Sequence, residues 1–289
     1  MKPYPECGLC MLKWIYERVT NSLGDEQRFS VFKKLMAVLA KELDPSINLG
    51  ILCNRSLEAV HEFLLASSGS FVPLKQKSNE AAGRLLEEAR DFIENSETPR
   101  VQFERACGLA AVSNVAPIGV PSAPYEFSMV EDIIKGRTPL PLPAGDIYDV
   151  ASKAQNVFYV TDNAGEIGFD SLVISLLKKM GSQVTLVVKE GPFFDDATME
   201  DVHYFALEQM VDTVCCVRGG IFVPDGKVAE LAQLFEESDF VISKGTGNFE
   251  ALKNYAEDKR VLYLLKSKCA PVSKETNTPE GEFIVRLEG

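Results

Sequence analysis

The sequence has little that would suit binding to nucleic acid or lipid. Its 289 residues carry 30 Lys and Arg against 42 Asp and Glu, a net charge of -12, and no basic run offsets this excess. Such a chain is repelled by nucleic-acid phosphates and anionic lipids. No stretch reaches the ~18 apolar residues of a membrane span, and residues 1–14 lack the apolar core of a signal peptide. We expect a cytoplasmic protein with neither nucleic acid nor membrane as a partner.

Histidine and paired cysteine are also scarce. The two histidines, His61 and His203, follow no predicted strand, which argues against a histidine-based metal site. Seven cysteines, an odd number, do not indicate a disulfide framework in a chain of this size. Cys7 and Cys10 form a CxxC pair near the first predicted helix, without a second such pair to complete a four-ligand zinc site. A metal or redox role and an apolar packing role both remain open for this pair, and packing is favoured.

The chain divides by pattern into two halves. Its composition, 46% hydrophobic and 25% charged, is that of a globular protein with a buried core. Residues 1–120 show helical spacing of apolar residues and predict a helical domain. Residues 121–149 contain five prolines and predict a connector. Residues 150–289 alternate amphipathic segments with buried-strand patterns, which predicts a parallel sheet with helices on both faces. The predicted strands are Val157–Thr161, Val184–Val188, Thr213–Val217, Phe240–Ile242 and Val261–Leu265.

Polar residues follow these strands, where an open α/β sheet binds its ligands. Asp162 and Asn163 come after the first strand, and Asp196 lies in the loop after the second. Their oxygens suit magnesium, manganese or another divalent ion better than zinc. Each of the three residues is also a good helix N-cap. Because all three are predicted at one sheet edge, metal ligation is favoured over capping.

The loop after the fourth strand resembles a phosphate cradle. Residues 243–248 read Ser-Lys-Gly-Thr-Gly-Asn, so Lys244 adds a positive charge to a glycine turn that exposes backbone N–H groups before a helix. The loop is not a Walker motif, and the first strand is not followed by GxGxxG. The sequence therefore argues against a P-loop enzyme and a dinucleotide-binding one.

Four linked motifs in these loops, at residues 162–166, 195–198, 243–250 and 266–269, resemble the damage-control phosphatase family, also called domain of unknown function 89. The N-terminal CxxC resembles its prokaryotic branch. The resemblance implies a Rossmann-like α/β/α domain with a parallel sheet, joined to an all-helical N-terminal domain. It implies a phosphatase that acts on sugar phosphates or damaged phosphometabolites and requires magnesium, manganese, cobalt or nickel.

The resemblance also implies a site. The metal ligands are Asp162, Asn163 and Asp196. Asp162, Asp196 and Lys244 are the predicted catalytic residues. The residues expected to contact the phosphate or the substrate are Asn114, Glu166, Lys244, Gly245, Asn248 and Lys268.

The chain departs from the family pattern at several positions. Asp195 stands where the family usually has Asn, and Thr246 where it has Gln. Val115-Ala116-Pro117 replaces the end of a helical-domain motif, and Gly69-Ser70 replaces an Asp-Pro. The predicted metal ligands are unaffected, whereas the substrate contacts from the helical side differ.

The predicted mechanism is in-line attack on phosphorus by a metal-activated water. Asp162 as a covalent nucleophile ranks second, because no Asp-x-Asp follows the first strand. Two other functions stay open. One is an S-adenosylmethionine-dependent carboxyl methyltransferase, and the other is a non-catalytic module that binds metal or phosphate.

Overall fold

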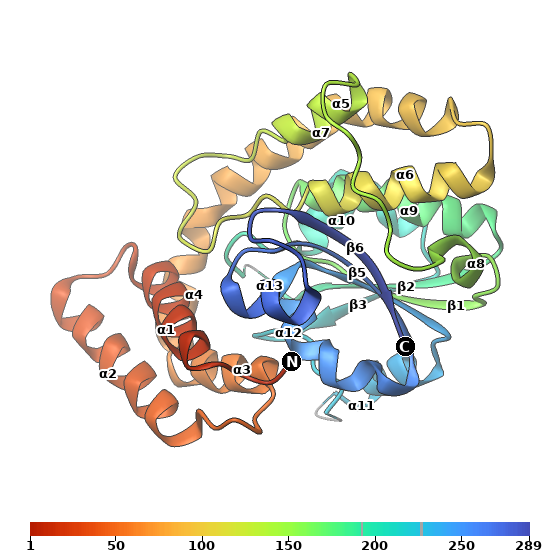
Figure 1. Ribbon diagram of the computed structural model, residues 1–289. Helices are drawn as coiled ribbons and strands as arrows, with labels where there is room; N and C mark the ends of the chain where they lie inside the picture. Colours follow the sequence, from red (N-terminus) through yellow and green to blue (C-terminus); the bar gives the residue numbers. More distant parts are fainter. Residues whose placement is uncertain (192, 226–227) are drawn as a thin grey trace.

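The sheet lies at the centre of the protein, whose computed structural model describes residues 1–191, 193–225 and 228–289 (Figure 1). Its order is β3-β2-β1-β4-β5-β6. Five strands are parallel, and β6 runs antiparallel to β5 at the edge. The strands are β1 (Asn156–Val160), β2 (Gln183–Lys189), β3 (Thr213–Val217), β4 (Phe240–Lys244), β5 (Arg260–Lys266) and β6 (Phe283–Glu288).

Two hydrophobic cores flank the sheet because side chains alternate along each strand. In β1, Val157 and Tyr159 join one core, and Phe158 and Val160 join the other. All four side chains are buried, which explains why the strand patterns lack polar alternation.

Helices cover both faces of the sheet (Figure 1). On one face α5, α6 and α9 pack together, and α6 also contacts β5 and β6. The other face is covered by α11, α12 and α13. The helices are α1 (Pro5–Thr20), α2 (Asp25–Glu42), α3 (Leu49–Ala59), α4 (His61–Ser68), α5 (Val72–Glu94), α6 (Pro99–Val112), α7 (Ser128–Ile134), α8 (Ile147–Ala151), α9 (Glu166–Lys179), α10 (Met199–Tyr204), α11 (Ala229–Glu237), α12 (Gly245–Leu252) and α13 (Ala270–Thr276).

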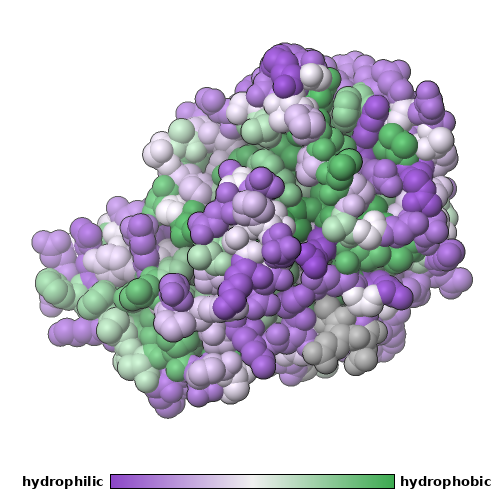
Figure 2. All heavy atoms as spheres, in the orientation of Figure 1, coloured by the Kyte–Doolittle hydropathy of each residue, from purple (hydrophilic) through white to green (hydrophobic). Residues whose placement is uncertain are grey.

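The helical segment 1–120 has two parts. Helices α1 to α4 form a group beside the sheet, whereas α5 and α6 lie across it (Figure 1). Apolar side chains are visible over the α1–α2 group (Figure 2). The exposed apolar residues of these two helices include Leu9, Phe29 and Phe32. Among the described residues, no helix has both the length and the apolarity required to cross a bilayer.

The predicted strands match β1 to β5 within two residues at each end. The fourth strand, β4, lies beside the first, and Val157 pairs with Phe240. The sixth strand, β6, was not predicted. Because the chain extends the sheet from β1 toward β3 and then from β4 toward β6, the topological switch point lies between β1 and β4. A crevice at their carboxyl ends is the expected ligand site.

Candidate active site

Two loops at this switch point are held together by backbone hydrogen bonds. The N–H of Ala197 donates to the carbonyl of Asp162 at 2.8 Å, and that of Ala164 donates to the carbonyl of Asp195 at 2.9 Å. Asn163 and Asp196 form an isolated β-bridge. The backbone therefore places Asp162, Asn163 and Asp196 next to one another, although 32 residues separate Asn163 from Asp196.

Helix capping does not explain these three residues. The N-cap of α9 is Gly165, which has no side chain to cap with. The N-cap of α10 is Thr198, and it forms a capping box with Asp201. The capping alternative for Asp162, Asn163 and Asp196 is therefore wrong.

The carboxylates of this set are crowded together. Burial raises the pKa of Asp162 to about 6, and the nearby charge of Glu166 adds to the effect. Burial, Asp162 and Asp195 raise the pKa of Asp196 well above its usual range, against the opposing effect of Lys189. A bound cation would offset both the burial of these carboxylates and their mutual repulsion.

The amide of Asn163 completes a set of oxygens that fits a hard divalent cation. Its Nδ2 donates to Asp162 at 2.7 Å and to Glu166 at 2.9 Å, so its Oδ1 is the atom available as a ligand. Within the described ranges, no group of three or more His, Cys, Asp and Glu side chains is arranged to hold a metal. The fit therefore rests on two carboxylates and one amide oxygen, which are ligand types that magnesium and manganese prefer.

Asn114 reaches this set from the end of α6. Its Nδ2 donates to Asp162 at 2.8 Å and to both oxygens of Glu166, and its Oδ1 accepts from the backbone N–H of Lys266 at 3.1 Å. Asn114 thus connects the loops after β1 and β5. Its polar atoms are engaged within the protein, where its hydrogen bond fixes the orientation of the Asp162 carboxylate.

The ammonium of Lys244 was expected in the phosphate site, but it is buried between two carboxylates. Its ammonium contacts Glu166 and Asp170, each at 2.7 Å, and its side chain is fully buried. Burial opposes its charged form, but the two carboxylates outweigh this and raise its pKa. The predicted phosphate contacts of Lys244 and Glu166 therefore need correction. Lys244 is the last residue of β4, and its side chain extends toward α9 instead of entering the crevice.

Two other lysines do face the crevice. Lys268 follows β5, and its ammonium makes no hydrogen bond or ion pair with any described residue. Burial lowers its pKa, although Asp162 and Glu166 act in the opposite direction. Lys189, at the end of β2, donates to the carbonyl of Gly220 at 2.9 Å and lies 3.8 Å from Asp196. Lys268 is therefore the cation most available to an anionic ligand.

Arg18 and Tyr125 also reach the site, and the sequence analysis missed both. The guanidinium of Arg18, on α1, is 3.2 Å from Asp195 and donates to the carbonyls of Ile118 and Gly119. The hydroxyl of Tyr125 donates to Asp195 as well. Asp195, the departure from the family pattern, is thus neutralised by an arginine about 180 residues away in the sequence, a pairing that no local motif signals.

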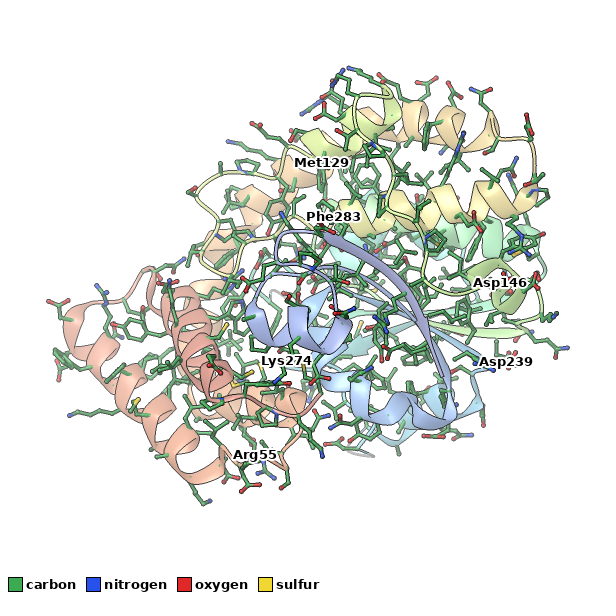
Figure 3. All side chains as sticks on the ribbon, in the orientation of Figure 1. Arg55, Met129, Asp146, Asp239, Lys274 and Phe283 are labelled. Atoms are coloured by element: carbon green, nitrogen blue, oxygen red, sulfur yellow. The ribbon has the colours of Figure 1, made fainter. Side chains whose placement is uncertain are left out.

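Several of these groups line a cavity of about 190 Å³. Among the predicted site residues, those that line it are Asp162, Asn163, Asp196, Asn248 and Lys268, whereas Asn114, Glu166, Lys244 and Gly245 lie behind its wall. Helices α1 and α13 meet beside it, where Lys274 lies over the ring of Tyr4 at 5.0 Å (Figure 3).

The comparisons with known proteins agree with this architecture. Residues 4–284 match the model of the damage-control phosphatase ARMT1-like domain. The chain belongs to this family. It is 29% identical to damage-control phosphatase PH1575 of Pyrococcus horikoshii, over 98% of this chain and 97% of that protein. It is 27% identical to a damage-control phosphatase of Archaeoglobus fulgidus, over 99% of each chain. A crystal structure of the P. horikoshii DUF89 family protein superposes with a TM-score of 0.79, at 29% identity and full coverage of both chains.

Gly245 permits the close approach of two loops in this member of the family. Its φ of +77° favours glycine, and a Cβ there would overlap the carboxylate of Asp162. We expect Gly245→Ala to lower turnover by about 100-fold, because a small displacement of a catalytic group has effects of that size. The control is Gly181→Ala, where φ is +94° and nothing lies within 4 Å of the added Cβ. It should lose about 1–2 kcal/mol of stability and keep its activity. Equal turnover in the two variants, measured with a phosphate ester, would contradict this role.

Proposed function

We propose that this protein is a divalent-metal-dependent phosphatase that hydrolyses small phosphate esters, such as sugar phosphates or damaged phosphorylated metabolites. One observation carries the proposal. Asp162, Asn163 and Asp196 line the same cavity as Lys268. The ammonium of Lys268 forms no hydrogen bond or ion pair with any described residue, so it is free to bind an anion. The chain also belongs to a family in which relatives are named damage-control phosphatases, and this membership supports the same function.

Each group has a role in hydrolysis. Asp162, Asn163 and Asp196 would hold magnesium, manganese, cobalt or nickel, and the bound cation would supply a Lewis acid for a phosphoryl oxygen and a lower pKa for water. Lys268 would neutralise charge on the phosphoryl oxygens as the bond to the leaving alcohol breaks. Asn114 fixes the orientation of Asp162 through its 2.8 Å hydrogen bond. A carboxylate of this set accepts a proton from the attacking water.

Metal removal tests the proposal directly. We expect exhaustive treatment with EDTA to abolish phosphate release from a phosphate ester, because the buried carboxylates then lack their counter-charge. Addition of magnesium, manganese, cobalt or nickel should restore the activity. EDTA that has been saturated with the same metal is the control and should have no effect.

The outcomes separate the proposal from its alternatives. Full activity after complete chelation would contradict metal dependence. Metal and phosphate binding without hydrolysis of any ester would indicate a binding module. Binding of S-adenosylmethionine without phosphate release would favour a methyltransferase.

A further inference from the structure

The cavity wall has two kinds of surface. Charged and amide groups come from the strand-end loops, whereas helices α1 and α3 and the chain segments near residues 118, 193 and 221 supply apolar side chains. The apolar residues that matter most are Met11, Trp14, Leu49, Ile118, Phe193 and Ile221. Lys268 lines the same cavity, so a ligand with its phosphate beside Lys268 shares the cavity with this apolar surface.

Four thiols add to the apolar surface. Cys7, Cys10, Cys53 and Cys269 all line the cavity, and sulfur atoms are visible beside α1 (Figure 3). Burial raises the pKa of Cys10 and Cys269 to about 11 and that of Cys53 to about 12. These thiols are therefore protonated near neutral pH, and a protonated thiol behaves as a small apolar group.

Most polar donors on the wall already have partners inside the protein. Arg18 is bound to Asp195 and to backbone carbonyls. The amide of Asn248 donates to two carbonyls, and the hydroxyl of Thr246 donates to the carbonyl of Lys266. Lys189 donates to the carbonyl of Gly220. The several hydroxyl groups of a sugar would find few free donors here, and each hydroxyl that is buried without any partner weakens binding by roughly tenfold or more.

Glu6 and Glu250 are the carboxylates on this side of the cavity, and Glu250 is the less exposed of the two. Its carboxyl lies on the wall, and burial raises its pKa to about 7. The Glu250 carboxyl can form hydrogen bonds to one polar group of a ligand. A sugar has several hydroxyl groups, and one carboxyl does not satisfy all of them.

We propose that the site selects phosphate monoesters whose alcohol is largely apolar or aromatic, and that Trp14 is a specificity-determining residue for that alcohol. This inference rests on the proposed function and, among the phosphate esters named there, favours those of apolar alcohols over sugar phosphates. In the reaction, a water oxygen bonds to phosphorus, the bond from phosphorus to the alcohol oxygen breaks, and that oxygen takes up a proton. The products are inorganic phosphate and an apolar alcohol, which packs against the ring of Trp14 until it leaves.

A matched pair of substrates tests this selectivity. Phenylpropyl phosphate and a hexose phosphorylated at its primary hydroxyl both lose an unactivated primary alcohol, so they differ mainly in the polarity of the leaving group. With manganese present, we expect kcat/KM to be at least tenfold higher for phenylpropyl phosphate. Equal or faster hydrolysis of the hexose phosphate would overturn the inference while leaving the phosphatase proposal intact.

A pair of variants on α1 tests the role of Trp14. We expect Trp14→Ala to lower kcat/KM for phenylpropyl phosphate about tenfold more than for the hexose phosphate. Leu9→Ala removes an apolar side chain that is 72% exposed on the same helix, and it should leave the ratio unchanged. An equal loss for both substrates in Trp14→Ala would contradict a role in specificity.

Binding can be measured without turnover, because Trp14 is the only tryptophan of the chain. Titration of the wild-type protein with phenylpropylphosphonate, which has no phosphate ester to hydrolyse, should change its fluorescence saturably. The corresponding hexose phosphonate should require at least tenfold higher concentrations, and tighter binding of the hexose compound would overturn the inference. If no ester releases phosphate with any metal, the proposed function fails, whereas this titration still tests the apolar site.

Discussion

Replacement of Asp162 by asparagine is expected to reduce turnover by ~10²–10³-fold, the size of effect seen when one charge-stabilising group is removed from an active site. The change keeps the size of the side chain and an oxygen that can accept from Asn114 and Asn163. It removes the negative charge that we propose for metal ligation. Steady-state kinetics of phosphate release, measured over a range of metal concentrations, will show the loss.

The stability of this variant should move in the opposite direction. Because the pKa of Asp162 is raised to about 6, its charged form is less favourable in the folded protein than in the unfolded chain at neutral pH. A neutral asparagine should therefore leave the metal-free melting temperature unchanged or raise it. Added manganese should stabilise the wild type more than the variant, since ligands stabilise the state that binds them.

The control is Asp91→Asn, which neutralises an exposed carboxylate on α5. It should retain wild-type turnover and the stabilisation by manganese. If Asp162→Asn also retained both, Asp162 would be neither a ligand nor a catalytic group, and the proposed mechanism would be wrong.

The sequence predicted the location of the site better than the directions of its side chains. Buried β-branched runs marked β1 to β5, and parallel strands place their carboxyl ends at one edge. That reasoning brought Asp162, Asn163 and Asp196 together. It could not tell that Lys244 is the last residue of its strand, with its ammonium between Glu166 and Asp170. Strand register decides which face a side chain takes, and a one-residue shift reverses it.

Contacts between distant segments account for what the sequence did not predict. Arg18 pairs with Asp195 only because α1 packs beside the loop after β2. Likewise, Cys7 and Cys10 share a cavity wall with Cys269, although the CxxC pair is far from every strand-end motif in the sequence. The edge strand β6 pairs antiparallel with β5, and it lies outside the strand–helix alternation that identified the other five.

The structure assigns different tasks to Lys244 and Lys268, and matching substitutions should separate them. Lys244→Met leaves Glu166 and Asp170 buried without their shared cation. Breaking a buried ion pair in this way costs about 3–5 kcal/mol of stability. Lys268→Met removes an ammonium that forms no ion pair with any described residue, so its free energy of unfolding should change by less than about 1 kcal/mol.

The two substitutions should affect activity differently from the way they affect stability. Lys268→Met should lose ~10²-fold or more in turnover, because its charge is available to the phosphoryl oxygens. In Lys244→Met, activity should fall mainly through the disturbed Glu166–Asn114–Asp162 hydrogen bonds. Urea unfolding without metal and steady-state kinetics with metal give the two quantities for each variant.

A second substitution distinguishes an ion-pair role for Lys244 from a direct contact with substrate. In Lys244→Met, the further change Asp170→Asn removes one of the two orphaned charges while Tyr159 can still donate to the asparagine oxygen. We expect it to restore part of the lost stability, and its effect should be more favourable in Lys244→Met than in the wild type, where Asp170 pairs with Lys244. If Lys244→Met instead unfolded like the wild type and lost turnover as Lys268→Met does, Lys244 would act on the substrate, and its burial between two carboxylates would not describe the working enzyme.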